Sequence, residues 1–475
     1  MKTSTIIGTL LFILLTFISS SLAAQLDNSL TENQAREEAQ IAIDYIRKSH
    51  PNQYWANSKA IWDQYEKKLL DRKGKVSISQ HYFDLAHLFS LANDTHTQIY
   101  PDKESPGFKS VYPIRFRTFA DGLYVISADS NYEDYIGKKV VSIGGKSVSE
   151  IMDTLSEHVS SDNVERKKTL AEFLLVMPET YVVFNLAKNN KVELLLEDIE
   201  GNRSTGYLDK TDPKSFATVF YEDPESFGIL VPDHWKTVYD KLQVEAPFTR
   251  ENPRKKYWHK TLTAKSGKLV EYIQINKNDN EEIGETQFDF ILRVFQEIRQ
   301  KGDDVERIVI DLRYNLGGWI KNTAALSGLL YGSDFYKHGK TVVLIGRETV
   351  SAGAILAADI ESKNYAYFIG EPTGSKPNMF LDHKHVDMPY SKFYAESATD
   401  LYVVTNERDK RKYLAPDFPI SESFADFISG KDVFLTKAME VTTEEIKAAF
   451  KGYYRSDMWN RPSQKTASKK PGSVE

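Results

Sequence analysis

The sequence predicts an α/β protein with a layered core in its C-terminal half, preceded by a helical subdomain and a β-rich module. At 475 residues the chain is too long for one compact core, so several folding units are expected. From about residue 215 onward, short β-branched runs alternate with helical patterns, as in strands and helices packed in layers. Before this region, helical periodicity gives way to short alternating runs, which are typical of β-structure.

Residues 1–24 have the features of an export signal. Lys2 supplies the positive charge, an apolar run follows, and small residues provide a cleavage site after Ala23 or Ala24. An uncleaved membrane anchor is the alternative, for which the apolar run is short. No second stretch is apolar enough to span a membrane. Because the exported chain has no cysteine, we expect a bacterial protein in the periplasm or outside the cell. The net charge of −6 argues against a nucleic-acid partner.

Two units are expected before the core. Residues 25–105 form the helical subdomain, with helices predicted over 31–50, 56–70 and 77–91. Residues 110–210 form the β-rich module. Its stretch Gly137–Val148, with a Gly144-Gly145 turn, resembles the middle of a PDZ domain, which binds extended peptides by strand addition.

The layered core is expected over residues 215–445. Strands are predicted at 272–276, 307–312, 341–345, 366–369 and 401–405, and helices over 288–300, 322–330 and 352–362. The end of the chain, residues 460–475, is rich in Pro, Ser and Lys and is expected to be disordered.

Two segments of the core have the composition of an active site. Residues 307–318 and 341–353 each run from an apolar strand into glycine and polar residues before a helical pattern. Ser351 stands where a helix begins, and free N–H groups there favour developing negative charge. The segments could supply a nucleophile and an oxyanion hole made by the amides of Gly317, Gly318 and Ala352. On position alone, Ser351 is more commonly a helix N-cap.

Three blocks resemble the C-terminal-processing (tail-specific) serine peptidase family, which includes the tricorn core protease and a retinoid-binding relative. They are Asp311–Gly318, Thr349–Ala354 and Gly370–Asn378, in family order. The likeness extends upstream over most of the chain that follows the signal. It implies a core like that of Clp protease and crotonase, with Ser351 as nucleophile and backbone donors from Gly317, Gly318 and Ala352.

The family uses two different bases. Lys376 follows Ser351 at the offset of the lysine in processing peptidases, but Phe380 stands where those enzymes have glutamine. The tricorn-like branch uses histidine, and Asp94-Thr95-His96-Thr97 resembles its motif. A histidine titrates near neutrality, whereas a lysine needs a large pKa shift, so we favour His96 over Lys376. Without the resemblance, His96 would be read as a surface histidine at a helix end.

A third group should orient the base. Family spacing favours Asp409, with Glu407 and Asp417 as rivals. Asp417 also fits a structural turn.

These residues predict an exported serine endopeptidase that acts on a peptide or protein through an acyl-enzyme, without cofactor or metal. His383 and His385 lack the spacing of a metal site. The alternatives are a non-catalytic ligand- or peptide-binding protein on the same fold, and an acyl-CoA enzyme of crotonase type, which an export signal disfavours.

Overall fold

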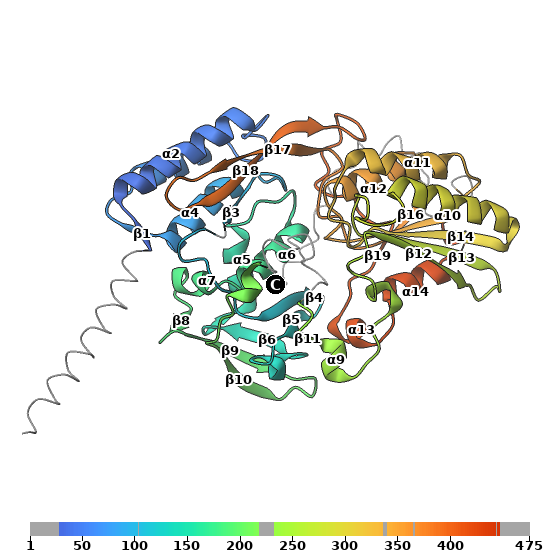
Figure 1. Ribbon diagram of the computed structural model, residues 1–475, viewed down its shortest axis with the longest axis horizontal. Helices are drawn as coiled ribbons and strands as arrows, with labels where there is room; N and C mark the ends of the chain where they lie inside the picture. Colours follow the sequence, from blue (N-terminus) through green and yellow to red (C-terminus); the bar gives the residue numbers. More distant parts are fainter. Residues whose placement is uncertain are drawn as a thin grey trace, which may run out of the picture.

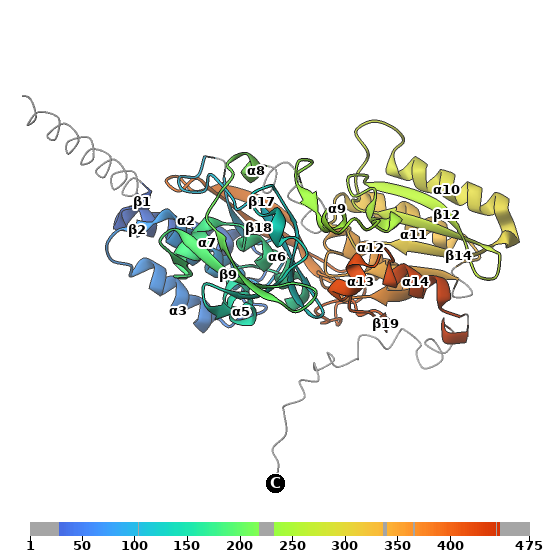
Figure 2. The ribbon, with the colours of Figure 1, turned by 90° about the horizontal axis from the view of Figure 1, so that it is seen from below.

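The chain forms two lobes that lie side by side (Figure 1; turned in Figure 2). The computed structural model describes residues 28–102, 104–217, 232–335, 340–363, 366–442 and 444–446. The expected signal at 1–24 and the expected tail at 460–475 lie outside this range. Within the described part, no helix is both long enough and apolar enough to cross a bilayer.

The expected N-terminal helices are present as α2 (Glu32–Ser49), α3 (Lys59–Leu70) and α4 (Ile78–Ser90). The first begins at a capping box in which Thr31 and Gln34 bond each other's backbone. Its apolar residues recur at helical spacing and form one buried face, made by Ala35, Ala39, Ala42, Ile43 and Ile46. A short pair of strands, β1 (Ser29–Leu30) and β2 (Val76–Ser77), joins the start of α2 to the start of α4.

The β-rich module completes the first lobe. Its sheet has the order β10-β9-β6-β5-β11, with β4 beside β5. The strands are β4 (Ile114–Phe119), β5 (Gly122–Ala128), β6 (Lys139–Ile143), β7 (Lys146–Ser147), β8 (Ala187–Lys188), β9 (Lys191–Glu197), β10 (Arg203–Leu208) and β11 (Lys236–Thr237). The associated helices are α5 (Val148–Ser156), α6 (Val164–Leu174) and α7 (Pro178–Val183), followed by α8 (Lys214–Ala217) and α9 (Val238–Leu242). Because β11 belongs to this sheet, the module takes a strand from beyond the expected boundary at residue 210.

The second lobe is a mixed sheet covered on both faces, ordered β12-β13-β14-β15-β16-β19 and parallel from β13 onward. Its strands are β12 (Tyr257–Thr263), β13 (Leu269–Ile275), β14 (Val305–Asp311), β15 (Thr341–Ile345), β16 (Tyr367–Gly370) and β19 (Phe418–Pro419). Its helices are α10 (Gln287–Lys301), α11 (Thr323–Tyr331), α12 (Ala352–Ser362), α13 (Phe424–Ile428) and α14 (Val433–Glu440).

The apolar runs of β14 and β15 follow from this layering. Ile308 and Ile310 pack with α10, α11 and α12, whereas Val309 packs with α14 on the opposite face. A strand buried on both faces needs apolar residues at every position rather than at alternate ones.

A hairpin from the second lobe reaches the first (Figure 1). Strands β17 (Met379–Asp387) and β18 (Phe393–Tyr402) pair with each other, and β18 pairs with β3 (Gln98–Pro101) of the first lobe. Buried Glu38 of α2 holds the hairpin turn by accepting the amides of Tyr390 and Ser391 at 2.6 and 2.7 Å. The prediction of a core strand at 401–405 is wrong. Only residues 401 and 402 belong to a strand, and this strand, β18, lies in the sheet with β17 and β3.

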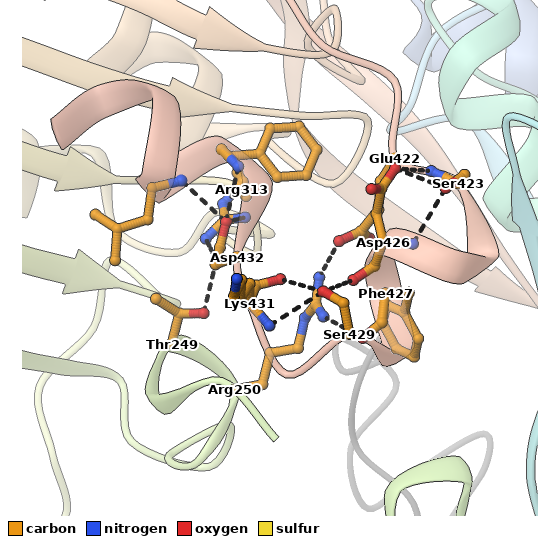
Figure 3. A network of polar contacts seen from close by, with 12 residues as sticks. Thr249, Arg250, Arg313, Glu422, Ser423, Asp426, Phe427, Ser429, Lys431 and Asp432 are labelled. Carbon is orange, nitrogen blue, oxygen red and sulfur yellow. Dashed lines mark hydrogen bonds and ion pairs between the residues drawn. The ribbon is translucent and has the colours of Figure 1, made fainter. Parts of the chain in front are cut away.

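The loop that follows β14 is fixed by buried charges (Figure 3). Arg313 bonds Asp311 on its own loop and Asp432 at the N-cap of α14, with Nη2–O distances of 2.6 Å to each. Nearby, Arg250 pairs with Glu422. Both of these guanidinium groups thus have a carboxylate partner, so Arg313 anchors the loop that carries Gly317 and Gly318.

Candidate active site

Ser351 lies in the turn between β15 and α12 in a strained conformation. Its φ of 50° and ψ of −129° are rare for a residue with a side chain, and strain of this kind costs on the order of 1–3 kcal/mol. Ser351 occupies the N-cap position of α12, as its place in the sequence predicts, but its side chain makes no capping hydrogen bond. The backbone amide donates to Ser375 Oγ at 3.2 Å, and the hydroxyl contacts His96.

Glycine is required at position 317 because the loop after β14 passes directly against Ser351. A Cβ at Gly317, whose φ is +112°, would lie 2.6 Å from Ser351 Cβ and 2.9 Å from its Oγ. The Gly317 amide donates to Asn315 Oδ1 at 3.0 Å. Within the described residues the amides of Gly318 and Ala352 donate no hydrogen bond, and Gly318 lines the cleft beside Ser351. Of the two glycines, Gly318 is therefore the one with a free donor.

His96 approaches Ser351 from the other lobe. It lies in the loop between α4 and β3, and its Nε2 is 3.1 Å from Ser351 Oγ. Asp94 shapes this loop by accepting the His96 amide at 2.8 Å on Oδ1 and His50 Nε2 at 2.9 Å on Oδ2. The Asn52 amide faces His50 Nδ1 at 3.1 Å, which leaves the proton of neutral His50 on Nε2 for Asp94.

The environment keeps His96 neutral and Asp94 charged. Burial lowers the pKa of His96, and the carboxylates of Asp94 and Asp162 offset this only in part. Burial alone would raise the pKa of Asp94, but the hydrogen bond from His50 brings it below its ordinary value. The neutral imidazole can accept the Ser351 proton on Nε2 when its own proton is on Nδ1. That Nδ1 is buried and has no hydrogen-bond partner within the described residues.

Lys376 is not brought to Ser351. Its Nζ lies 3.2 Å from Asp162 Oδ1 and 3.5 Å from the centre of the Trp55 ring. The ammonium is thus directed at a carboxylate and at an aromatic face, and not at the Ser351 hydroxyl. Its neighbour Ser375 contacts the site instead, between the Ser351 amide and Thr95.

The structure also does not bring Asp409 to His96. Asp409 accepts from Arg411, with an Nη2–Oδ2 distance of 2.7 Å, and Arg411 also binds Glu361 of α12. Through Arg411, Asp409 holds the loop after β18 against α12. Sequence spacing predicted Asp409 beside His96, but it could not show that Arg411 binds this carboxylate. Of the rivals, Glu407 is exposed, and Asp417 accepts the Phe368 amide at 2.9 Å.

Among the described residues, the carboxylates that act on His96 are instead Asp94, Asp162 and Glu396. Glu396 lies on β18, 3.3 Å from His383, and lines the same cleft. Sequence reasoning did not single out His50, Ser375 or Glu396. Ser375 lies within the block Gly370–Asn378, whereas no motif marks the other two.

A cleft of about 850 Å³ opens over the pair. It is lined from both lobes by Ser351, Gly318 and Trp319 on one side and by His96, α4, β3 and α6 on the other. Such a volume accommodates several side chains of an extended ligand.

No protein-family model and no curated protein matches the sequence. Among solved structures, mature CPAF matches with a TM-score of 0.61 and 12% identity, over 88% of this chain and 98% of its own. Mature CPAF complexed with lactacystin matches with a TM-score of 0.62 and 12% identity, over 88% and 99%. The tricorn protease matches with a TM-score of 0.34 and 14% identity, over 88% of this chain and 37% of its own, a score too low to support an argument. The CPAF matches confirm the expected fold class, a mixed α/β fold that this chain shares with CPAF, and at this identity they show the fold alone.

Proposed function

We propose that this chain is a serine peptidase that hydrolyses peptide bonds through an acyl-enzyme on Ser351, with His96 as general base. The observation that carries the proposal is the distance of 3.1 Å between His96 Nε2 and Ser351 Oγ, across two lobes. As Oγ attacks the peptide carbonyl carbon, Nε2 takes the hydroxyl proton, and the imidazolium then protonates the leaving amine. Water, deprotonated by the same imidazole, releases the acyl group and restores Ser351.

The negative charge that develops on the carbonyl oxygen needs preorganised donors. The free amides of Gly318 and Ala352 are suited to this role, because both flank Ser351 and neither is committed to another acceptor. The strained turn at Ser351 exposes the hydroxyl at the start of α12, where the helix dipole also favours an anion. As part of this proposal, residues 1–24 direct export, and the substrate is a peptide or protein outside the cytoplasm.

A fluorophosphonate probe tests the proposal directly, because only an activated serine is labelled. The wild-type protein should be labelled, whereas Ser351→Ala and His96→Ala should not. Lys376→Met removes the alternative base and should stay labelled. Labelling that survives in His96→Ala but is lost in Lys376→Met would transfer the role of base to the lysine.

The second candidate is a peptide-binding protein on the same fold. It is favoured by the His96 Nδ1, which within the described residues has no hydrogen bond to an acid of the kind that orients a catalytic imidazole. A folded wild-type protein that binds peptides but takes up no fluorophosphonate would establish this alternative.

A further inference from the structure

One wall of the cleft carries a positive charge that the proposed chemistry does not use. Arg166 of α6 lines the cleft together with Leu170, Phe173 and Leu174. These residues recur at helical spacing, so Arg166 stands in the apolar face of its helix rather than on the solvent face. It is only 6% exposed.

Arg166 has no partner in the described part of the chain. Its Nε and Nη1 are buried without a hydrogen bond, and no carboxylate lies within ion-pair distance of the guanidinium. Arg313 shows the contrast, since its equally buried guanidinium is bound by Asp311 and also by Asp432, the contact seen in Figure 3. Burying a charge without a partner costs free energy. Carboxylates offset this cost at Arg313, whereas at Arg166 no carboxylate of the described residues pairs with the guanidinium.

The surroundings of Arg166 have an excess of positive charge. Arg117 pairs with Glu348, and Arg347 lies 3.4 Å from Glu172, so both nearby glutamates already have a cation. Arg115 is also buried, and the same two glutamates, Glu172 and Glu348, act on it. Burial also lowers the pKa of Arg166, and Glu348 compensates this only in part. An anion entering the cleft would therefore meet the Arg166 guanidinium, whose Nε and Nη1 have no hydrogen-bond partner among the described residues.

We propose that Arg166 is a specificity-determining residue that binds a carboxylate of the ligand, and that the preferred peptide carries this carboxylate beside an apolar side chain. A guanidinium fork matches a carboxylate, and the adjoining Leu170, Phe173 and Leu174 accept the apolar group. The carboxylate comes either from an acidic side chain or from a free C-terminus. The proposal takes from the proposed function only that the ligand is a peptide.

Binding to the Ser351→Ala protein tests this without turnover. The probes are fluorescent short peptides with one apolar residue, prepared as Glu and Gln pairs and with free or amidated C-termini. Hydrogen bonds to charged groups contribute about 1.5–3 kcal/mol, so the carboxylate member should bind roughly tenfold or more tightly. Arg166→Met should remove this preference. Lys168→Met is the matched control, because it removes the same charge from the exposed face of the same helix and should keep the preference.

The pair that shows the preference identifies the source of the carboxylate. If the protein binds the carboxylate peptide preferentially but the wild type hydrolyses no peptide, the proposed peptidase activity is wrong and the proposed role of Arg166 holds. If the Ser351→Ala protein, which retains Arg166, binds the charged and neutral peptides equally, the proposed role of Arg166 is wrong. This outcome does not depend on whether Arg166→Met folds. A preference that survives in a folded Arg166→Met would overturn the proposed role as well.

A stability measurement gives a second readout. Removing an unpartnered buried charge should leave the thermal midpoint of Arg166→Met equal to that of wild type or higher. The carboxylate peptide should raise the midpoint of wild type but not that of Arg166→Met. A large drop in midpoint for Arg166→Met without peptide would indicate a structural partner instead.

Discussion

The two walls of the cleft are built in opposite ways. The Ser351 wall lies within one lobe: it comes from two neighbouring strand ends, β14 and β15, and Ser351 is contacted there by Gly317 and Ser375. The His96 wall is assembled from distant segments: Asp94 is bound by His50, 44 positions away, and Thr97 Oγ1 accepts the amide of Ala398, 301 positions away. The nucleophile is therefore positioned by local backbone geometry, whereas the base is positioned by tertiary packing. Substitutions in the Ser351 wall should therefore act on the nucleophile alone, whereas substitutions in the His96 wall should act on stability as well.

Ser351→Ala removes the hydroxyl that would attack the peptide bond. Removing a catalytic serine costs about 10⁶ in turnover, so hydrolysis of a fluorogenic peptide should vanish. The circular dichroism spectrum should stay that of wild type because the hydroxyl makes no capping bond. Hydrolysis at the wild-type rate would remove Ser351 from the mechanism.

Gly317→Ala tests how closely the same wall is packed. The new Cβ would lie 2.6 Å from Ser351 Cβ and must displace the nucleophile, and misplacement of about 1 Å costs roughly 10²-fold in rate. Gly145→Ala is the matched control, since its φ of +82° brings similar backbone strain but no atom lies within 4 Å. Equal kcat values for the two variants would show that strain, and not collision, determines the outcome.

Asp94→Asn acts on the assembled wall without touching Ser351. The carboxylate accepts N–H groups on both oxygens, and an amide can accept on only one, so one donor loses its partner. We expect a loss of about 1–3 kcal/mol in the free energy of unfolding, measured with denaturant. We expect a fall in kcat of roughly tenfold, because the His96 loop is less fixed. Asp129→Asn, in a turn after β5, should change neither quantity.

Lys376→Met separates the two possible bases. Since Nζ faces Asp162 and the Trp55 ring, its loss should lower turnover by less than about tenfold, through repacking alone. The measurement is kcat on the same fluorogenic peptide. A loss as large as that of Ser351→Ala would contradict the assignment of His96.

The smallest expected effect is a shift in pH dependence. His96 acts as a base only when it is neutral, so kcat/KM should fall as pH drops through its pKa. Burial lowers this pKa, and the acidic limb should therefore have its midpoint below the ordinary value of 6.5. Asp94→Asn should move the limb to still lower pH, because the Asp94 charge raises the pKa of His96. A midpoint above 6.5 would contradict the burial argument.

The sequence by itself determined the elements whose causes are local. The apolar runs of β14 and β15, the capping box at Thr31 and the glycines beside Ser351 all express short-range chemistry, and the structure contains each of these elements. The juxtaposition of His96 and Ser351 could be expected from two motifs, but their distance could not.

Only the tertiary structure decided which distant groups meet. Asp409 was chosen by spacing, yet Arg411 and Thr405 hold it elsewhere. Residues 401–405 were expected in the core sheet, yet the end of β18 follows β17 because their pairing continues the hairpin that closes onto β3. The sequence shows that Arg166 is a charged residue within the apolar face of a helix. Only the packing of the surrounding elements determines that its guanidinium has no ion-pair partner among the described residues. Hydrogen bonds between remote segments form only after the lobes pack, so no local pattern specifies them.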